Sequence, residues 1–374
     1  MIVIMNSNTY CPMPFVHIYS NSAGVYDMCC HASMQSEIGK QKITVNDTLP
    51  FDHFLSPSMD KIRKKMLNNE KVSGCENCYR KENLDGNSKR TEYIKSEGYT
   101  TELNKVIIKL RIFGNYCNLS CYMCHPFNSS TRTNELIELN ENYGWRFEDN
   151  MRFTKVSYEQ VENNIIKNIH RIKAIHVTGG EPLQSLRMYE FFEKIPNEYN
   201  HIPIGFTTNL TKVQWKNKSL DDILEKFTNV GLKISCDHYL DKLNWIRYPI
   251  DVDEFENNIF QYRKYSKISP TISVLNVNEL DNINKYYLEN FQLKVFYDSG
   301  AIVNSPYVLT PANHYNYLNL QKKYKNSKTY SHLYTYLTGD NWLEYRDENR
   351  KNMFIYLDKL SKKRGDYKKL WNKI

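Results

Sequence analysis

The segment Cys117-Asn118-Leu119-Ser120-Cys121-Tyr122-Met123-Cys124 closely follows an apolar run that predicts a β-strand. Its C-x3-C-x2-C spacing places three thiols in one short loop. Three thiolates can hold a cubane iron–sulfur cluster while one iron keeps an open coordination position, whereas a structural zinc site uses four protein ligands. An open position favours catalysis over a structural role. The alternative is a zinc knuckle in which His125 supplies the fourth ligand.

Strands and helices alternate around this segment, between about residues 105 and 299. Strands are predicted over residues 106–113, 174–178, 204–208, 232–236, 271–277 and 293–297. Amphipathic helices are predicted between them, over residues 158–172, 185–195, 219–227, 252–265 and 279–289. Repeated βα units indicate a parallel sheet, in which the loops at the carboxyl ends of the strands converge on one site.

A second motif, Thr178-Gly179-Gly180-Glu181-Pro182, follows the second predicted strand. Glycine allows the backbone to approach a ligand closely and to adopt a positive φ. The carboxylate of Glu181 could pair with a ligand ammonium group through a charge-assisted hydrogen bond. Alone, this motif is an ordinary turn. One strand after the cysteine segment, it indicates a shared site.

Together these two motifs resemble the signature of the radical S-adenosylmethionine (radical SAM) superfamily. The resemblance implies an α/β fold in the form of a partial (β/α)6 TIM-like barrel. It also implies a [4Fe-4S] cluster that is held by the catalytic residues Cys117, Cys121 and Cys124. It implies that S-adenosylmethionine binds the open iron and is cleaved reductively to a 5'-deoxyadenosyl radical, which abstracts a hydrogen atom from the substrate. The methionine end of the cofactor would be received by Gly179, Gly180, Glu181 and Pro182.

Further cofactor contacts are implied by the same resemblance. Ser235 and Asp237, at the end of the fourth predicted strand, resemble a Ser-x-Asp segment near the ribose, and hydroxyl and carboxylate groups suit ribose hydroxyls. The alternative for Asp237 is a surface cap of the next helix. Many members place an aromatic residue directly before the third cysteine to pack on adenine, whereas here Met123 stands there and Tyr122 precedes it. The remaining candidates are Thr208, Asn209 and Asn276, while Cys236 is expected to be a buried strand residue.

The N-terminal segment, residues 1–95, is rich in cysteine and differs from the rest of the chain. Short strands are predicted at residues 15–19 and 25–29, and a helix at 58–67. The segment resembles the auxiliary-cluster modules called SPASM and twitch domains, which in many family members follow the barrel. We assign the ligands of a second [4Fe-4S] cluster to Cys11, Cys29, Cys75 and Cys78, with Cys30 as the substitute for Cys29 and His31 as an incidental neighbour. A structural zinc site is the alternative, because four cysteines alone do not distinguish zinc from iron.

The C-terminal segment, residues 305–374, begins with Pro306 and Pro311 and is then rich in Lys, Tyr and Asn. Helical spacing recurs at residues 312–323, 353–362 and 367–371. We therefore expect three parts: an auxiliary-cluster module at 1–95, a core barrel at 96–304 and a helical closing segment at 305–374.

The whole chain has 374 residues and a formal net charge of +8, from 50 basic and 42 acidic residues. This balance is typical of a solvated cationic surface rather than a nucleic-acid groove. We expect no signal peptide and no membrane span, because the N-terminal apolar run is short and no apolar stretch of 18 residues is present. Nine cysteines in short groups fit metal ligation in a reducing, cytoplasmic compartment.

The resemblance also implies partners. An external electron donor such as a flavodoxin or ferredoxin would reduce the cluster. Auxiliary-cluster members commonly modify peptides or proteins, so that is the first expectation for the substrate, and a nucleotide, an RNA or a small metabolite is the alternative. A non-catalytic iron–sulfur or zinc scaffold is the hypothesis of another class.

Overall fold

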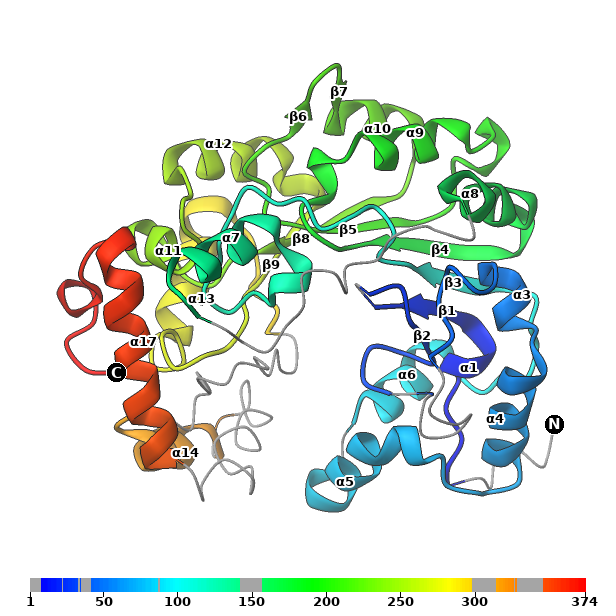
Figure 1. The fold of residues 1–374 in the computed structure, drawn as a ribbon, viewed down its shortest axis with the longest axis horizontal. Helices are drawn as coiled ribbons and strands as arrows, with labels where there is room; N and C mark the ends of the chain where they lie inside the picture. The colour runs from blue at the N-terminus through cyan, green and yellow to red at the C-terminus, as the bar shows by residue number, and fades with distance from the viewer. Residues whose placement is uncertain are drawn as a thin grey trace.

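The computed structural model describes residues 8–21, 23–32, 34, 42–86, 88–141, 157–297, 314–325, 327 and 346–374. Within these residues a seven-stranded sheet has the order β2-β1-β3-β4-β5-β8-β9 (Figure 1). The strands from β1 to β9 in this order run parallel, and β2 joins β1 antiparallel at one edge. The strands are β1 (His17–Ser20), β2 (Tyr26–Asp27), β3 (Val106–Lys109), β4 (Ile172–Val177), β5 (Ile204–Thr208), β8 (Val230–Ser235) and β9 (Ser266–Ser269).

Helices between the parallel strands cover one face of this sheet. They are α8 (Tyr158–Lys167), α9 (Leu186–Lys194), α10 (Leu220–Lys226), α12 (Val252–Tyr262) and α13 (Leu280–Phe291). Figure 1 shows α8, α9 and α10 on the same side of β4 and β5. Ile175 and Phe206 of the strands are buried in one apolar cluster with Phe192 and Ile259 of the helices. The predicted α/β architecture with a mostly parallel sheet is therefore confirmed.

Serine capping boxes fix the starts of two of these helices. The hydroxyl of Ser157 accepts from the backbone N–H of Gln160, whose side chain accepts in return from the N–H of Ser157. Ser219 and Asp222 do the same at α10, directly after the small ribbon of β6 (Gln214–Trp215) and β7 (Lys218–Ser219). Each box satisfies two backbone donors that a helix start otherwise leaves open, which is why both helices begin within one residue of the predicted positions.

The prediction of a strand at residues 271–277 is wrong. The fifth strand of the barrel, β9, ends at Ser269, and the following residues form a turn. The side chain of Asn276 closes this turn: its Oδ1 accepts from the N–H of Ser273 at 2.8 Å, and its Nδ2 donates to the carbonyl of Thr271 at 2.8 Å. Apolar residues here suggested a strand, but this local side-chain bonding holds the backbone in a turn instead.

The sixth predicted strand, residues 293–297, is reduced to one parallel bridge between Ile268 and Val295. The sheet is thus an open, partial barrel in the part of the chain that the structure describes. The remaining predicted strands keep their places with ends shifted by a few residues, β3 being the most shortened, and the prediction at 204–208 matches β5.

The N-terminal segment adds to the same sheet. Strand β1 pairs in parallel with β3, so the sheet crosses the predicted boundary at residue 95, and the division at that residue stays a prediction. The helices are α1 (Met13–Val16), α3 (Pro50–Phe54), α4 (Pro57–Leu67), α5 (Glu76–Asp85) and α6 (Lys89–Glu97). Helix α4 confirms the helix predicted at 58–67, whereas Phe15 and Val16 are helical and not part of a strand. A second apolar cluster gathers α1 and α4 around Cys11, Cys29 and Cys75.

The C-terminal part contributes α14 (Tyr317–Lys325), α17 (Arg346–Arg364) and a 3-10 turn (Tyr367–Lys369). The prediction at 312–323 begins outside the described residues, and α17 is longer than the predicted 353–362. Met353, Leu357 and Leu360 of α17 are buried in a third apolar cluster with Trp245 of α11 (Leu240–Ile246) and Leu136 of α7 (Ser130–Glu138). Helix α17 therefore packs against elements that follow β3 and β8. None of the helices that the structure describes combines the length and apolar character that a membrane span requires.

Candidate active site

The three cysteines of the segment after β3 lie together at the carboxyl end of the sheet. Cys117 and Cys121 are buried and Cys124 is half-buried. Burial raises the pKa of all three thiols, and repulsion from the neighbouring thiol of Cys121 raises the pKa of Cys117 and Cys124 further, the latter to about 12. Such mutual repulsion needs short separations. Three clustered thiols, two of them on buried residues, fit a metal cluster, whose positive charge would favour the thiolates.

The Gly-Gly-Glu turn after β4 packs directly on the backbone of the cysteine loop. The N–H of Glu181 donates to the carbonyl of Tyr116 at 2.7 Å, and the N–H of Gly180 donates to the carbonyl of Gly114 at 3.3 Å. A Cβ atom at Gly180 would lie 2.1 Å from the carbonyl oxygen of Tyr116, and Gly179 has a φ of +154°. Glycine is therefore required here to bring the two loops together.

Glu181 is buried, and residues at the end of β5 hold its carboxylate. It accepts hydrogen bonds from Thr208 Oγ1 at 2.6 Å, from the N–H of Asn209 at 2.7 Å and from the N–H of Leu183 at 3.1 Å. Burial raises the pKa of Glu181 to about 7, against the effect of these donors. The structure thus brings Glu181, Thr208 and Asn209 together, as their sequence positions predict.

Asn209 links this carboxylate to the cysteine loop. Its Nδ2 donates to Asn118 Oδ1 at 3.0 Å and lies 3.8 Å from the sulfur of Cys117. Asn118 in turn donates to Thr211 Oγ1 at 2.9 Å, and Thr211 donates to Asn209 Oδ1 at 2.7 Å. This ring of side chains holds the cysteine loop against β5. Asn118 follows Cys117 directly and Thr211 lies two residues after Asn209, and neither was among the site residues predicted from the sequence.

Asp237 is fully buried, so the alternative of a surface helix cap is wrong. Its Oδ2 lies 2.6 Å from Nε of Arg247, and its Oδ1 accepts from the N–H of Thr271 at 2.6 Å. Nη1 of Arg247 also donates to the sulfur of Cys121 at 3.5 Å. The carboxylate is thereby engaged by protein groups that face the cysteine loop, and Arg247 is a site residue that the sequence analysis missed.

The other predicted cofactor contacts are placed less directly. Ser235 is half-buried at the end of β8, and Nδ2 of Asn276 donates to the backbone carbonyl of Asp237 at 3.1 Å. Pro182 is buried at the start of a 3-10 turn. Tyr122 is buried in the apolar cluster of α17, with its ring centroid 6.5 Å from that of Trp245, whereas Met123 lies half-buried between this cluster and the central one. Cys236 is buried, as predicted, but it lies one residue beyond the end of β8 and not in the strand.

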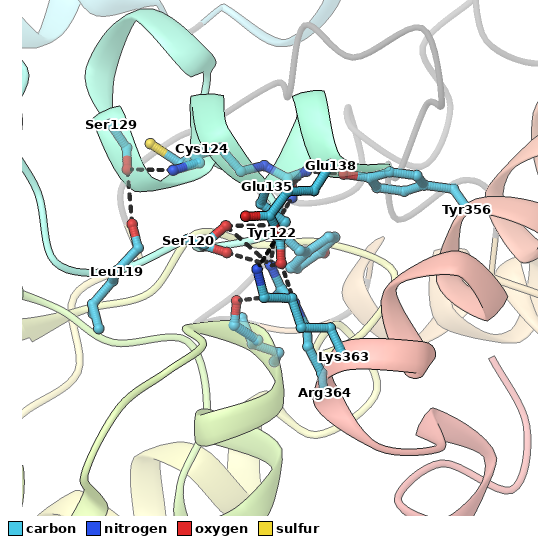
Figure 2. Close-up of polar contacts among 12 residues, drawn as sticks. Leu119, Ser120, Tyr122, Cys124, Ser129, Glu135, Glu138, Tyr356, Lys363 and Arg364 are labelled. Atoms are coloured by element: carbon cyan, nitrogen blue, oxygen red, sulfur yellow. Dashed lines mark hydrogen bonds and ion pairs between the residues drawn. The ribbon is translucent and has the colours of Figure 1, made fainter. Parts of the chain in front are cut away.

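A buried ion-pair network lies directly beneath the cysteine loop (Figure 2). Glu135 of α7 contacts Arg132 and also Arg364 of α17, and all three side chains are at most 3% exposed. Arg364 also donates to the carbonyl of Ser120 and, at 2.9 Å, to that of Trp245. Burial alone would raise the pKa of Glu135, but the two guanidinium groups outweigh it and hold the pKa below its usual value. The end of α17 therefore supports the loop that carries the cysteines.

Four N-terminal cysteines are also brought together. Cys11, Cys29 and Cys75 are buried and Cys78 is half-buried, whereas Cys30 is exposed. Burial raises the pKa of the Cys11 thiol to about 12, and repulsion from Cys78 adds to this shift. Burial also raises the pKa of Cys29 well above its usual value, and repulsion from Cys11 and Cys75 raises it further. The buried Cys29 is thus better placed than Cys30 to join this set.

Neither cysteine set is arranged around one point. Within the described residues, no group of three or more His, Cys, Asp or Glu side chains is spaced to hold a single metal ion. In a [4Fe-4S] cluster each cysteine binds a different iron, so the ligands surround the cluster rather than converge on one ion.

Comparison with known protein families places the cysteine loop and the Gly-Gly-Glu turn in one matched region. Residues 112–284 match the model of the Radical SAM superfamily. This part of the chain is therefore similar to that superfamily. The matched radical SAM region contains the three cysteines, the Gly-Gly-Glu turn and Asp237 with Arg247, whereas the N-terminal cysteines and α17 lie outside it. The family implies a [4Fe-4S] cluster and S-adenosylmethionine, and the clustered thiols of the radical SAM region fit such a cluster.

A curated relative and two solved structures resemble parts of the chain. Over 132 residues the chain is 30% identical to a GTP 3',8-cyclase of Campylobacter lari. This alignment covers 34% of the chain and 35% of that protein. The chain thus spans about a third of the length of this relative. A structure of native anSMEcpe with bound AdoMet covers 66% of this chain and 62% of its own, at 17% identity and a TM-score of 0.39. A structure of TYW1 with a lysine-pyruvate adduct bound covers 73% of this chain and 90% of its own, at 17% identity and a TM-score of 0.30. Scores this low do not establish a shared fold.

The raised pKa of Glu181 predicts that the affinity for S-adenosylmethionine depends on pH. A carboxyl with a pKa of about 7 is mostly protonated at pH 5.5 and half ionised at pH 7.0, whereas an α-amino group, with a pKa near 7.7–8.0, stays protonated over this range. If Glu181 pairs with the ligand ammonium, binding to the cluster-loaded protein should tighten by about tenfold between these values. Equilibrium dialysis at both pH values measures this.

Two variants control that experiment. Glu181→Gln should bind more weakly and lose the pH dependence. Glu279→Gln should keep the dependence, because hydrogen bonds from His238 and Lys242 outweigh burial and hold the pKa of Glu279 at about 2, outside the tested range. A pH dependence that persists in Glu181→Gln would show that another group is responsible.

Proposed function

We propose that the chain binds a [4Fe-4S] cluster through Cys117, Cys121 and Cys124 and uses it to cleave S-adenosylmethionine for hydrogen abstraction from a substrate. The observation that carries this proposal is the convergence of three neighbouring cysteines, two of them buried, with buried Glu181 at the carboxyl end of one parallel sheet. When bound, the cluster and S-adenosylmethionine supply the electron and the 5'-deoxyadenosyl radical.

The residues of the chain would bind and orient this cofactor. Gly179 and Gly180 allow the turn after β4 to lie against the cysteine loop, which brings Glu181 to the same site. Thr208 and Asn209 fix its carboxylate by hydrogen bonds, so that it could receive the methionine ammonium in one orientation. Such pre-set orientation lowers the entropic cost of reaction. The electron would come from an external donor such as a flavodoxin or ferredoxin.

The test is product formation by anaerobically reconstituted protein. With dithionite as reductant, the protein should release 5'-deoxyadenosine and methionine from S-adenosylmethionine. A non-catalytic iron–sulfur or zinc scaffold would release neither. The absence of both products from protein with a full complement of iron and sulfide would overturn the proposal.

We further propose a second [4Fe-4S] cluster at Cys11, Cys29, Cys75 and Cys78, as in twitch or SPASM modules. Support comes from the burial and mutual repulsion of these thiols. Replacing Cys75 and Cys78 together by alanine should lower iron content by about half, from about eight to about four atoms per chain, on the basis of two cubanes. Cys30→Ala, which removes the exposed neighbour, should leave iron content unchanged. Unchanged iron with loss of zinc would identify a structural zinc site instead.

Two substrate classes follow from different observations. A peptide or protein is supported by the likeness of the N-terminal cysteine set to auxiliary-cluster modules. A nucleotide is supported by the relative named GTP 3',8-cyclase, whose likeness covers 34% of this chain.

A further inference from the structure

The segment at the end of α11 pairs edge to edge with the cysteine loop. The backbone N–H of Ser120 donates to the carbonyl of Tyr248 at 2.6 Å, and the N–H of Tyr122 donates to the carbonyl of Ile246 at 3.0 Å. Cys121 lies between the two donor residues. The residue between the two acceptor residues is therefore held opposite Cys121 by the backbone.

Arg247 is the residue between these two acceptors, and its guanidinium group contacts two partners at once. Nε lies 2.6 Å from Oδ2 of Asp237, and Nη1 donates to the sulfur of Cys121 at 3.5 Å. The carboxylate of Asp237 is held in turn, since its Oδ1 accepts from the N–H of Thr271 at 2.6 Å. The side chain of Arg247 is only 8% exposed. Its direction toward the sulfur is thus fixed at both ends.

Arg364 of α17 joins the same two segments from beneath. It donates to the carbonyl of Ser120 on the cysteine loop and, at 3.4 Å, to the carbonyl of Ile246 on the opposite segment (Figure 2). The side chain of Arg364 is fully buried. Backbone pairing and a buried cross-link therefore both hold Arg247 opposite Cys121. An ion pair that served only to neutralise Asp237 would need neither of them.

A hydrogen bond to a cluster ligand changes the reduction potential of the cluster. The gain of one electron makes the cluster and its cysteine sulfurs more negative, so a cationic N–H donor stabilises the reduced form more than the oxidised form. Burial strengthens this effect, because the local dielectric constant is low. The sulfur of Cys117 has a neutral neighbour instead, Nδ2 of Asn209 at 3.8 Å. Arg247 thus supplies a charged donor at Cys121.

We propose that Arg247 is a positioning residue whose hydrogen bond to the sulfur of Cys121 raises the reduction potential of the proposed three-cysteine cluster. In the step that this favours, one electron passes from the external donor to the cluster, so the donor is oxidised and the cluster is reduced. Asp237 orients the guanidinium group for this role. The inference rests on the proposed function, since it concerns the regulation of the same site.

Arg247→Lys tests the hydrogen bond while keeping the ion pair. A lysine ammonium group ends at the position of Cζ, where it can still pair with Asp237 but stops a bond short of Nη1. At a fixed potential, the ratio of reduced to oxidised cluster should fall by about tenfold, which corresponds to about 59 mV for a one-electron couple. A redox titration of the anaerobically reconstituted full-length protein, followed by electron paramagnetic resonance without S-adenosylmethionine, measures this. The signal that is lost in Cys121→Ala reports the cluster.

A second variant and a control complete the test. Asp237→Asn combined with Arg247→Met removes both charges together, so no unpaired charge is left buried, and the potential should again fall. Arg263→Lys makes the matched substitution at an exposed arginine that follows α12, and the potential should stay at the wild-type value. Iron content and urea denaturation show that each variant is loaded and folded.

The titration separates this inference from the proposed function. Lower potentials in both Arg247 variants support the inference. Wild-type potentials in these variants, or an equal fall in Arg263→Lys, overturn it and leave the proposed function in place. If the Arg247 variants have lower potentials but the wild-type protein forms no 5'-deoxyadenosine, the proposed function fails and the role of Arg247 stands. If the wild-type protein has no signal that depends on Cys121, both fail.

Discussion

Replacing Cys121 by alanine is expected to lower 5'-deoxyadenosine formation by more than about 100-fold. Loss of one residue that merely supports a metal ligand already costs about 10- to 100-fold in affinity or activity, and Cys121 is a proposed ligand itself. Its sulfur is buried and receives a hydrogen bond from Arg247 at 3.5 Å, so solvent could not readily supply a replacement ligand. Iron content and product formation, measured on the same anaerobic sample, check this expectation.

Cys236→Ala is the matched control for that experiment. Cys236 is also buried and free, but its sulfur contacts Tyr287 Oη at 2.8 Å on the helix side of β8 and takes no part in either cysteine set. This variant should keep its full iron content. Undiminished product formation by Cys121→Ala would remove this cysteine from the proposed cluster site.

Replacing Glu135 by glutamine is expected to lower the free energy of unfolding by about 3–5 kcal/mol, the cost of removing one partner from a buried ion pair. Glu135 is 1% exposed and compensates the buried guanidinium groups of Arg132 and Arg364. Without its charge these two cations would repel each other beneath the cysteine loop. Urea denaturation at pH 7 measures the change.

The control lies on the same two helices. Glu138 pairs with Lys363 in the same way as Glu135 pairs with Arg364, but the two side chains are 59% and 40% exposed, and Figure 2 shows both pairs side by side. An exposed pair contributes less than about 1 kcal/mol, so Glu138→Gln should be nearly neutral. Equal effects of both substitutions would contradict the assignment of the buried network.

The contribution of Glu135 should also vanish in acid. Its pKa is lowered in the folded protein, so the stabilisation is present above the ordinary carboxyl pKa and is lost as pH falls through the folded value. The difference in stability between wild type and Glu135→Gln should therefore shrink at low pH.

Motifs and strands that depend on local sequence were predictable. The cysteine segment, the Gly-Gly-Glu turn and Thr208 with Asn209 each follow a strand, and parallel topology alone brings strand ends together. The strand predicted at residues 271–277 failed because apolar composition does not distinguish a strand from a buried turn that one side chain, Asn276, holds by hydrogen bonds. That the N-terminal segment and the barrel share one sheet could not be predicted either, because the pairing of β1 with β3 joins residues about 90 positions apart.

Side chains that act across long sequence separations could not be found from the sequence. Arg247 lies 126 positions from Cys121, whose sulfur it contacts, and no spacing rule relates the two. Arg364 lies in a helix whose composition indicates only a solvated, lysine-rich surface, yet it is fully buried.

The contact between Arg364 and Ser120 has a consequence for biosynthesis. These residues are 244 positions apart, and a ribosome adds about 5–20 residues per second. The thiols therefore emerge at least about 10 s before the arginine that fixes their loop is made. Until then the loop lacks its support, and the nascent thiols would be open to oxidation or to the wrong metal. Delivery of iron and sulfide is thus expected to follow release of the chain rather than accompany its synthesis.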